Sequence, residues 1–440
     1  MLIFAYIVIG GKMMEIITKI EEFIWSTPLV LLLILTHIFF SIKLKWPQKY
    51  TFKGLKLMFK GNDKTQKGIS SFKSLMTVLA ATLGTGNIIG IAAAITIGGI
   101  GSIFWIFISG IFAIATKYAE TYLVLKYRKS GENGYYGGAM YVLRDVLNNK
   151  RLAKLFSIFV IAAAFGMGAM IQSNAMSISL QETFTTNKYF IAIIVTIVCS
   201  YMIFGDEKRI SNISSVLVPI ATIVYMIMCF YLLYMFRYNL IPSIIYIVKE
   251  AFSLEAVGGG IFGIVAIRAM NAGMSKGLFS NEAGMGSSPL FNATVNISNL
   301  KDESIIASTS VFIDTVFLCS ITGLVFVASG MWNLSNETMS LVQDTFALIP
   351  YGKYLLTFSL AIFALATIPC WSYYGSIGIK FIFKDNKFAQ KLYRYIYILC
   401  VYIGTVTALK FVLSMSSIAN ALMILPNLFM MYRLRNKIEK

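Results

Sequence analysis

Charged residues are scarce in this chain: they make up 13% of its 440 residues, whereas hydrophobic residues make up 57%. The mean hydropathy is +0.73. A soluble protein has too little interior to hide that much apolar surface, and several stretches approach the roughly 20 apolar residues that cross a bilayer. The composition therefore excludes a soluble globular protein and predicts an all-α polytopic membrane protein. A transmembrane β-barrel would show short alternating segments instead.

Residues that bind metals or form disulfides are also few. The chain has one histidine, His37, and five cysteines, which lie in apolar stretches without CxxC spacing. We expect the cysteines to be small buried hydrophobic residues, and His37 to be a packing or interface residue. The patterns GxxxxGK[ST] and HExxH do not occur in the sequence. The sequence therefore indicates neither an ATP-driven pump nor an enzyme.

Acidic residues are outnumbered 20 to 38 by lysine and arginine, which gives a net charge of +18. The basic residues gather in alternate connectors, above all in 43–73, and at the end of the chain. This distribution follows the positive-inside rule, and no basic stretch belongs to a soluble module that would bind nucleic acid. We therefore expect a bacterial or archaeal cytoplasmic membrane, with the N-terminus outside and the C-terminus in the cytoplasm.

Eleven hydrophobic stretches are predicted to span the membrane. They are about 25–42, then 74–98, 103–125, 155–180, 189–204 and 213–236, then 257–292, 305–331, 355–380, 392–413 and 418–434. The last ten spans form two sets of five. Because five is an odd number, the second set starts on the opposite side of the membrane and runs inverted relative to the first. We therefore predict a 5+5 inverted repeat. Its parts are an N-terminal helix and basic connector (1–73), a first repeat (74–238), an extracellular connector (239–256), a second repeat (257–434) and a cytoplasmic tail (435–440).

One glycine-rich break interrupts the first span of each set of five. Residues 84–87 read Gly-Thr-Gly-Asn, and residues 277–284 read Gly-Leu-Phe-Ser-Asn-Glu-Ala-Gly. Unwound backbone inside a membrane is tolerated only in protein or around a cavity, where its amides suit a carboxylate and its carbonyls suit a hard cation. Broken helices at matching positions predict the binding site of a secondary transporter. Close helix packing through small residues is the alternative interpretation.

Polar side chains near the breaks are candidate substrate contacts. Ser280 and Asn281 could bond an ammonium or a carboxylate, and Phe279 could wall a small apolar side chain. Glu282 has three open roles: to neutralise a substrate amine, to bind a cation, or only to pair with a base. Gln172, in another predicted span, is either a substrate contact or a helix–helix hydrogen-bonding residue.

Other polar groups inside the predicted spans also need partners. Lys117 and Glu120 are three residues apart, which predicts a local ion pair. Asp314 lies in an apolar stretch, and Arg268 is a candidate partner for it or for the acidic residue of the second break. The hydroxyl of Thr367 could complete a sodium shell made mostly of carbonyls.

Several segments match one family pattern, and the run 277–287 (GLFSNEAGMGS) is the most specific of them. The others are 84–88 (GTGNI), 115–120 (ATKYAE), 137–141 (GGAMY), 208–210 (KRI) with 218–219 (VP), 311–315 (VFIDT), and 418–422 (IANAL) with 426–427 (PN). Over about residues 75–434 the chain resembles the alanine or glycine:cation symporter family, the sodium:alanine symporters.

The resemblance implies a leucine-transporter-like fold, Na⁺ as the coupling ion, and uptake of a small neutral amino acid such as alanine or glycine across the lipid bilayer. It places the substrate carboxylate on the amides of the first break, and the substrate-binding residues would be Thr85, Gly86, Asn87, Gln172, Phe279, Ser280 and Asn281. It places sodium between the first break and one later span, and the sodium-binding residues would be Ala80, Leu83, Phe363, Ala366 and Thr367.

The chain departs from the family pattern at three positions. Ala366 stands where the family prefers serine, which removes one hydroxyl from the expected sodium shell. Ser376 stands where glutamate is usual, and Ser417 where an acidic residue is common. Two alternative functions therefore stay open. One is a proton-coupled carrier that uses Glu282 or Asp314, and the other is a channel or sensor that does not transport.

Overall fold

The computed structural model describes residues 14–59, 69–131, 134–205, 207–252, 264–297, 299–335, 337–384 and 386–439. Parts of the basic connector and of the predicted extracellular connector lie outside these ranges. The long helices are α2 (Thr27–Lys43), α4 (Ser71–Thr82), α5 (Ile89–Gly98), α6 (Ser102–Lys126), α8 (Lys150–Ala163), α9 (Gln172–Phe184), α10 (Lys188–Ile203), α11 (Glu207–Met235), α12 (Leu240–Ala251), α13 (Ile264–Asn281), α15 (Leu300–Val311), α16 (Ser320–Ala328), α17 (Thr338–Ala347), α18 (Gly352–Phe383), α19 (Lys387–Val406) and α20 (Leu409–Arg433).

Shorter elements connect or interrupt these helices. The π-helical segments η3 (Ala164–Ile171) and η5 (Phe312–Cys319) join α8 to α9 and α15 to α16. One antiparallel hairpin pairs β1 (Lys129–Gly131) with β2 (Gly134–Tyr136). The other short helices are η1 (Pro47–Tyr50), α3 (Thr51–Leu57), η2 (Thr85–Asn87), α7 (Ala139–Asp145), η4 (Arg237–Asn239), α14 (Pro289–Asn292), η6 (Met331–Asn333) and η7 (Arg435–Lys437).

Seven helical stretches in the described part of the chain are long and apolar enough to cross a membrane, and the bent pair α4–α5 makes up to eight. The other predicted spans correspond to α10, α13 and α19. Helix α10 has only 16 residues, α13 contains two basic residues, and the basic residues of α19 lie in its first eight positions. The structure confirms an all-helical membrane protein, whereas the count of eleven spans and the inverted repeat stay predictions.

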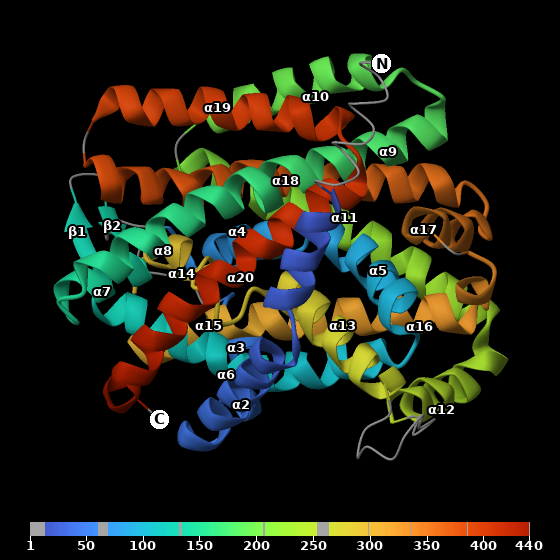
Figure 1. Cartoon of the computed structure of the whole chain (residues 1–440), viewed down its shortest axis with the longest axis horizontal. Helices are drawn as coiled ribbons and strands as arrows, with labels where there is room; N and C mark the ends of the chain where they lie inside the picture. The colour runs from blue at the N-terminus through green and yellow to red at the C-terminus, as the bar shows by residue number, and fades with distance from the viewer. Residues whose placement is uncertain are drawn as a thin grey trace.

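The two broken segments lie in the middle of the bundle (Figure 1). Helix α13 packs against both α5 and α6, and α18 packs against α4, α8 and α11, while α10 and α19 lie side by side at one edge. Every side chain from residue 74 to 95 is buried. The unwound backbone of the first break is therefore enclosed by protein, as a break inside a membrane requires.

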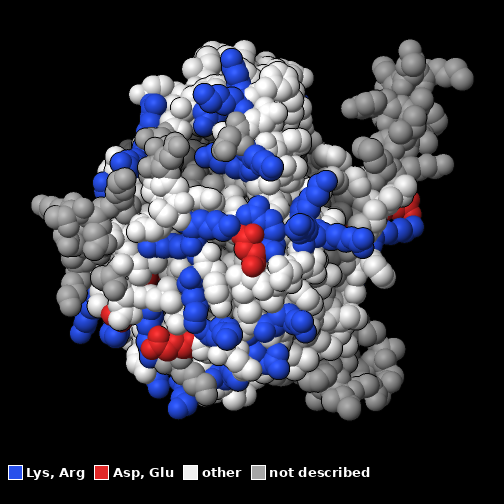
Figure 2. Space-filling view, turned by 90° about the vertical axis from the view of Figure 1, so that its left-hand side faces the viewer, with Lys and Arg blue, Asp and Glu red and all other residues white. Residues whose placement is uncertain are grey.

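Basic side chains gather on one end of the molecule. Lys and Arg far outnumber acidic residues over the face that lies at the left of Figure 1, where the β1–β2 hairpin and α7 are found (Figure 2). A face rich in basic side chains is what the positive-inside rule leads us to expect on the cytoplasmic side. The orientation of the termini stays a prediction.

Helix α2, the predicted N-terminal span, packs on α6. His37 is buried, and its Nδ1 atom lies 2.7 Å from the hydroxyl of Thr116. The expectation that His37 is a packing residue is therefore confirmed. Four of the cysteines are buried and Cys400 is half-buried.

Candidate functional site

The first break lies where the sequence predicts it. Helix α4 ends at Thr82 and α5 begins at Ile89, with a single turn of 3₁₀-helix between them, and the two half-helices are bent by 61°. Gly84 is extended, with φ −104° and ψ −163°. The side chains of Thr85 and Asn87 are buried. The break therefore exposes backbone groups to a protein interior, where they need specific partners.

Gln172, the first residue of α9, faces this break. Its Oε1 atom accepts hydrogen bonds from the backbone amide of Thr85 at 3.1 Å and from the Thr85 hydroxyl at 3.0 Å. Its Nε2 atom donates to the carbonyl of Met167 in η3. The carboxamide oxygen thus contacts the amide that the family resemblance assigns to a substrate carboxylate.

The second break lies further along the chain than the sequence predicts. Helix α13 continues through Asn281, and the backbone leaves the helix at 282–288. Left-handed conformations occur at Glu282 (φ 55°), Gly284 (φ 90°) and Gly286 (φ 77°). Gly277 instead permits close packing, because a Cβ atom there would lie 2.7 Å from Ser109 Oγ on α6. The alternative interpretation, helix packing through small residues, therefore holds for that glycine.

A buried carboxylate on α6 holds the loop of the second break. Glu120 Oε2 accepts hydrogen bonds from the backbone amides of Gly284 at 3.0 Å and of Gly286 at 3.1 Å. The same oxygen accepts a bond of 2.9 Å from Asn427 Nδ2 on α20. Asn427 also donates to the carbonyl of Gly284. Glu120 and Asn427 were not among the predicted site residues, although both lie in segments that match the family pattern.

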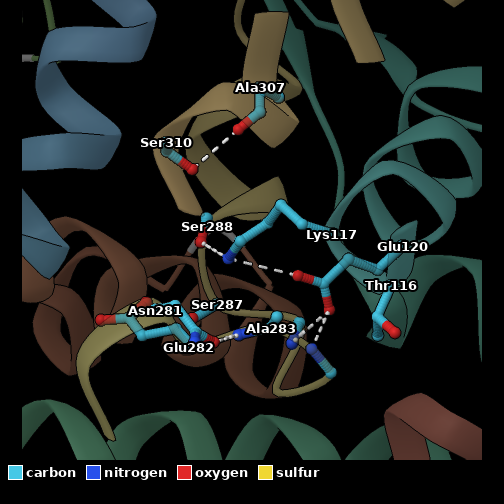
Figure 3. A network of polar contacts seen from close by, with 12 residues as sticks. Thr116, Lys117, Glu120, Asn281, Glu282, Ala283, Ser287, Ser288, Ala307 and Ser310 are labelled. Atoms are coloured by element: carbon cyan, nitrogen blue, oxygen red, sulfur yellow. Dashed lines mark hydrogen bonds and ion pairs between the residues drawn. The ribbon is translucent and has the colours of Figure 1, made fainter. Parts of the chain in front are cut away.

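The predicted ion pair between Lys117 and Glu120 is confirmed, with 3.3 Å between Lys117 Nζ and Glu120 Oε1. Both side chains are fully buried. Lys117 also reaches the end of the second break, because Nζ donates to Ser288 Oγ at 2.5 Å (Figure 3). The pair is therefore more than a contact within α6. Lys117 binds the end of the second-break loop, and Glu120 binds its backbone amides, so both residues tie α6 to that loop.

Asp314 gathers polar side chains from both broken spans. It accepts hydrogen bonds from Asn87 Nδ2, from Ser280 Oγ at 2.6 Å and from Thr315 Oγ1 at 2.7 Å. In the part of the chain that the structure describes, no ion pair joins Arg268 to Asp314 or to the acidic residue of the second break. The cluster is rich in oxygen acceptors, as a site for a proton or a hard cation would be.

The other predicted substrate residues divide into two groups. Phe279 lines a pocket with Thr85 and Gly86. Asn281 instead accepts a hydrogen bond from the amide of Ala283 at 2.9 Å, and so stabilises the start of the second break. Glu282 accepts a hydrogen bond from Ser287 Oγ. The structure thus brings Thr85, Gly86 and Phe279 together around one cavity and turns Ser280 and Asn281 toward other partners.

Three of the predicted sodium-binding residues meet between α4 and α18. The hydroxyl of Thr367 lies 2.6 Å from the carbonyl oxygen of Ala80 and 2.8 Å from that of Phe363. Two carbonyls and a hydroxyl are the ligand types that hold sodium beside a broken transporter helix. Ala366 is buried and offers only a methyl group, and Leu83 is buried in the turn that follows α4. Among the described residues, no group of His, Cys, Asp or Glu is arranged to hold a transition metal.

We expect Gly286→Ala to abolish the transport that the family resemblance implies. The left-handed φ of Gly286 costs roughly 1 kcal/mol for a residue with a side chain, and the new Cβ atom would lie 2.6 Å from Asn427 Oδ1 and 3.1 Å from the ring of Phe156. Alanine would therefore displace the amide from Glu120. Uptake in vesicles is the measurement. Gly330→Ala is the control, because Gly330 has a similar φ of 75° and a Cβ there meets no heavy atom within 4 Å. Normal uptake by the Gly286 variant would contradict the expected geometry.

Comparison with known proteins identifies the family. The model of the sodium:alanine symporter family matches residues 11–440. An uncharacterized transporter of Haemophilus influenzae is 37% identical over 96% of this chain and 94% of its own length. The sodium/alanine symporter AgcS of Methanococcus maripaludis is 34% identical over 94% of this chain and 93% of its own length.

A solved structure has the same fold. The crystal structure of MhsT in complex with L-phenylalanine matches with a TM-score of 0.60 at 14% identity, over 84% of this chain and 89% of that chain. This similarity confirms the predicted leucine-transporter-like class. The sequence match over nearly the whole length identifies a family of transporters, not of enzymes. The chain belongs to the sodium:alanine symporter family.

Proposed function

We propose that this secondary transporter couples the inward movement of sodium to the uptake of a small neutral amino acid of the alanine or glycine type. One observation supports this most directly: the Thr367 hydroxyl and the carbonyls of Ala80 and Phe363 converge beside the first break. The relative AgcS, a sodium/alanine symporter, covers nearly the same length. Sodium in this position would tie α4 to α18 and fix the conformation of the break.

The substrate carboxylate would then bind the amides of Thr85 and Gly86. In doing so it would replace the Gln172 oxygen, which now accepts the Thr85 amide hydrogen. Phe279 lines the adjoining cavity, where its ring would limit the size of the substrate side chain. Ser280 bonds to Asp314, and Asn281 bonds to the loop of the second break. We therefore assign both residues the role of positioning the site rather than of binding the substrate directly.

Coupling between sodium and the amino acid follows from the first break, which both of them would use. Because ion and amino acid both use the first break, each lowers the dissociation constant of the other by the same factor. Sodium that moves inward also gains roughly 2.3 kcal/mol per 100 mV of inside-negative potential. Alternating access would come from rocking of the repeat at 74–238 against the inverted repeat at 257–434. The basic face of Figure 2 would lie in the cytoplasm of a bacterial or archaeal cell.

The test is uptake of labelled alanine and glycine into vesicles. We expect saturable accumulation that requires an inward sodium gradient and is lost when potassium replaces sodium. Accumulation that ignores sodium but collapses with the pH gradient would overturn sodium coupling in favour of protons. Binding without accumulation would indicate a channel or sensor and would refute the proposal.

Proton coupling is the second candidate, and the Asp314 cluster favours it. This buried carboxylate meets Asn87 and Ser280 at the centre of both broken spans, and no described cation pairs with it. A carboxylate in such a place could bind a proton and so take the role of a coupling ion.

We expect Ala366→Ser to strengthen sodium activation. The added hydroxyl would provide the ligand that the family pattern has and this chain lacks, next to Thr367. The half-saturating sodium concentration for alanine uptake should fall several-fold, while the KM for alanine at saturating sodium stays the same. An unchanged sodium response would remove position 366 from the proposed shell.

A further inference from the structure

The pocket beside the first break contains one charged side chain that the proposed function leaves without a role. Helix α13 contributes Lys276 and Phe279 to this pocket, three residues apart and therefore on one helical face. Every other lining residue is polar and uncharged or apolar: Thr85, Gly86, Ile89, Gly90, Ala93, Ile171, Ala175, Phe279 and Leu413. Only 8% of the Lys276 surface is exposed.

The ammonium of Lys276 is poorly paired. Its ion pair is with Glu21 Oε1 at 4.0 Å, which is longer than a hydrogen bond between charged groups. Its nearest described ring is Phe279, 5.9 Å from Nζ to the ring centroid. A buried charge inside a membrane is costly unless it is closely paired and hydrogen-bonded. Lys276 therefore has hydrogen-bond donors to offer to a ligand in the pocket.

Glu21 comes from the helical stretch before α2, which runs from Met14. Next to it, the Trp25 indole Nε1 donates to the carbonyl of Ser417 on α20 at 3.2 Å. This contact fixes the stretch near a helix that also lines the pocket. Glu21 is thus a counter-charge for Lys276 from outside the pocket lining, with 21% of its side chain exposed. A ligand oxygen could take its place without leaving Glu21 buried and alone.

Space for a ligand side chain adjoins the first break on α5. A Cβ atom added at Gly90 would meet no heavy atom within 4 Å, and the neighbouring lining residues Ala93 and Ala175 are small. A substrate whose carboxylate lies on the amides of Thr85 and Gly86 could place its side chain in this space, toward Lys276. An ammonium there attracts an oxygen acceptor and repels a second positive charge.

We propose that Lys276 is a specificity-determining residue: it accepts amino acids whose side chain ends in a hydroxyl or carboxamide oxygen and rejects those with a cationic side chain. The inference rests on the proposed amino-acid site and names which side chains that site takes beyond alanine and glycine. The methyl side chain of alanine offers no oxygen acceptor to the ammonium, so alanine binding should depend little on Lys276.

The test is competition against labelled alanine uptake by serine, asparagine, glutamine and ornithine. In the Lys276→Met variant we expect at least a tenfold loss of affinity for asparagine or glutamine, a gain for ornithine, and a KM for alanine within about threefold of the wild-type value. Lys276→Arg should keep the wild-type preference. Equal changes for all competitors, or none, would overturn the inference.

Two further variants separate selectivity from structure. Arg268→Met removes an exposed positive charge from the same helix and should leave the competitor order unchanged. Glu21→Gln removes the counter-charge and should keep or raise the affinity for asparagine and glutamine, because the competing carboxylate is gone. A loss in Glu21→Gln equal to that in Lys276→Met would show that the pair acts only structurally, and would overturn the inference.

The same comparison can be made by binding alone. If Lys276→Met does not accumulate in membranes, Lys276→Gln replaces it in the same panel. Thermal stabilisation of purified protein by alanine, asparagine and ornithine reports affinity without transport. A wild-type protein that binds these ligands but shows no sodium-dependent uptake would refute the proposed function, while the Lys276 comparison would still decide this inference.

Discussion

Replacing Glu120 with alanine should abolish transport and strongly reduce the amount of folded protein. The substitution leaves Lys117, which is fully buried, without a counter-charge. Breaking a buried ion pair by removing one partner costs about 3–5 kcal/mol. It also leaves the amides of Gly284 and Gly286 without their acceptor. Thermal unfolding in detergent and alanine uptake in vesicles are the two measurements.

Matched variants separate the charge from the hydrogen bonds. Glu120→Gln keeps one acceptor oxygen and should retain more folded protein than the alanine variant. The double variant Lys117→Met with Glu120→Met removes both charges, so much of the stability should return. Transport should not return, because no carboxylate then holds the second break. Wild-type stability in Glu120→Ala alone would contradict the role that we assign to the pair.

Thr367→Val should raise the half-saturating sodium concentration by at least tenfold while the protein stays folded. Valine has nearly the shape of threonine, so packing in α18 is preserved, but the hydroxyl beside the carbonyls of Ala80 and Phe363 is lost. One oxygen ligand of the proposed sodium shell disappears with it. Alanine uptake as a function of sodium concentration is the measurement, with size-exclusion chromatography as the check on folding.

The matched control lies ten residues earlier on the same helix. Thr357 is also buried, and its hydroxyl bonds with Ser179 Oγ on α9 at 2.7 Å. Thr357→Val should therefore alter stability without changing the sodium response. A normal sodium response in Thr367→Val would refute the sodium site. An equal loss in both variants would mean that the hydroxyl of Thr367 matters only for packing.

The first break could be located from the sequence because every residue of Gly84–Asn87 works against a helix locally, in a stretch otherwise apolar enough to be a span. The residues that would bind sodium through the backbone followed from this location and from the family resemblance. The structure places Thr367 against the Ala80 carbonyl, as that prediction requires. Local chemistry and tertiary position agree on the place of the break, whereas the sodium site itself stays a prediction.

The second break was placed about one turn too early, and the reason is physical. Glycine serves both to open a helix and to let two helices approach closely, and the sequence does not distinguish these uses. Gly277 serves the second use, against Ser109. The conformations that require glycine occur at Gly284 and Gly286, where φ is positive.

The residues that the sequence reasoning missed act over long distances in the chain. Asn427 reaches Glu120 across 307 positions, and Lys276 finds its counter-charge in the N-terminal stretch. Such contacts depend on how helices pack, which hydropathy and spacing do not determine. The π-helical segments η3 and η5 were not predicted either, because their composition is that of an ordinary apolar helix.

The bend of 61° between α4 and α5 has a consequence for the order of events in the cycle. Helix α4, which would be the inner half in the proposed orientation, is held by α18 through Thr367 at Ala80 and through the Trp371 indole at the Ala81 carbonyl. Helix α5, the outer half in that orientation, packs instead against α13 and α17. Departure of the ion toward the cell interior would loosen only the inner half, so the external entrance would stay shut while cargo leaves. Such a division would guard against a continuous leak through the protein.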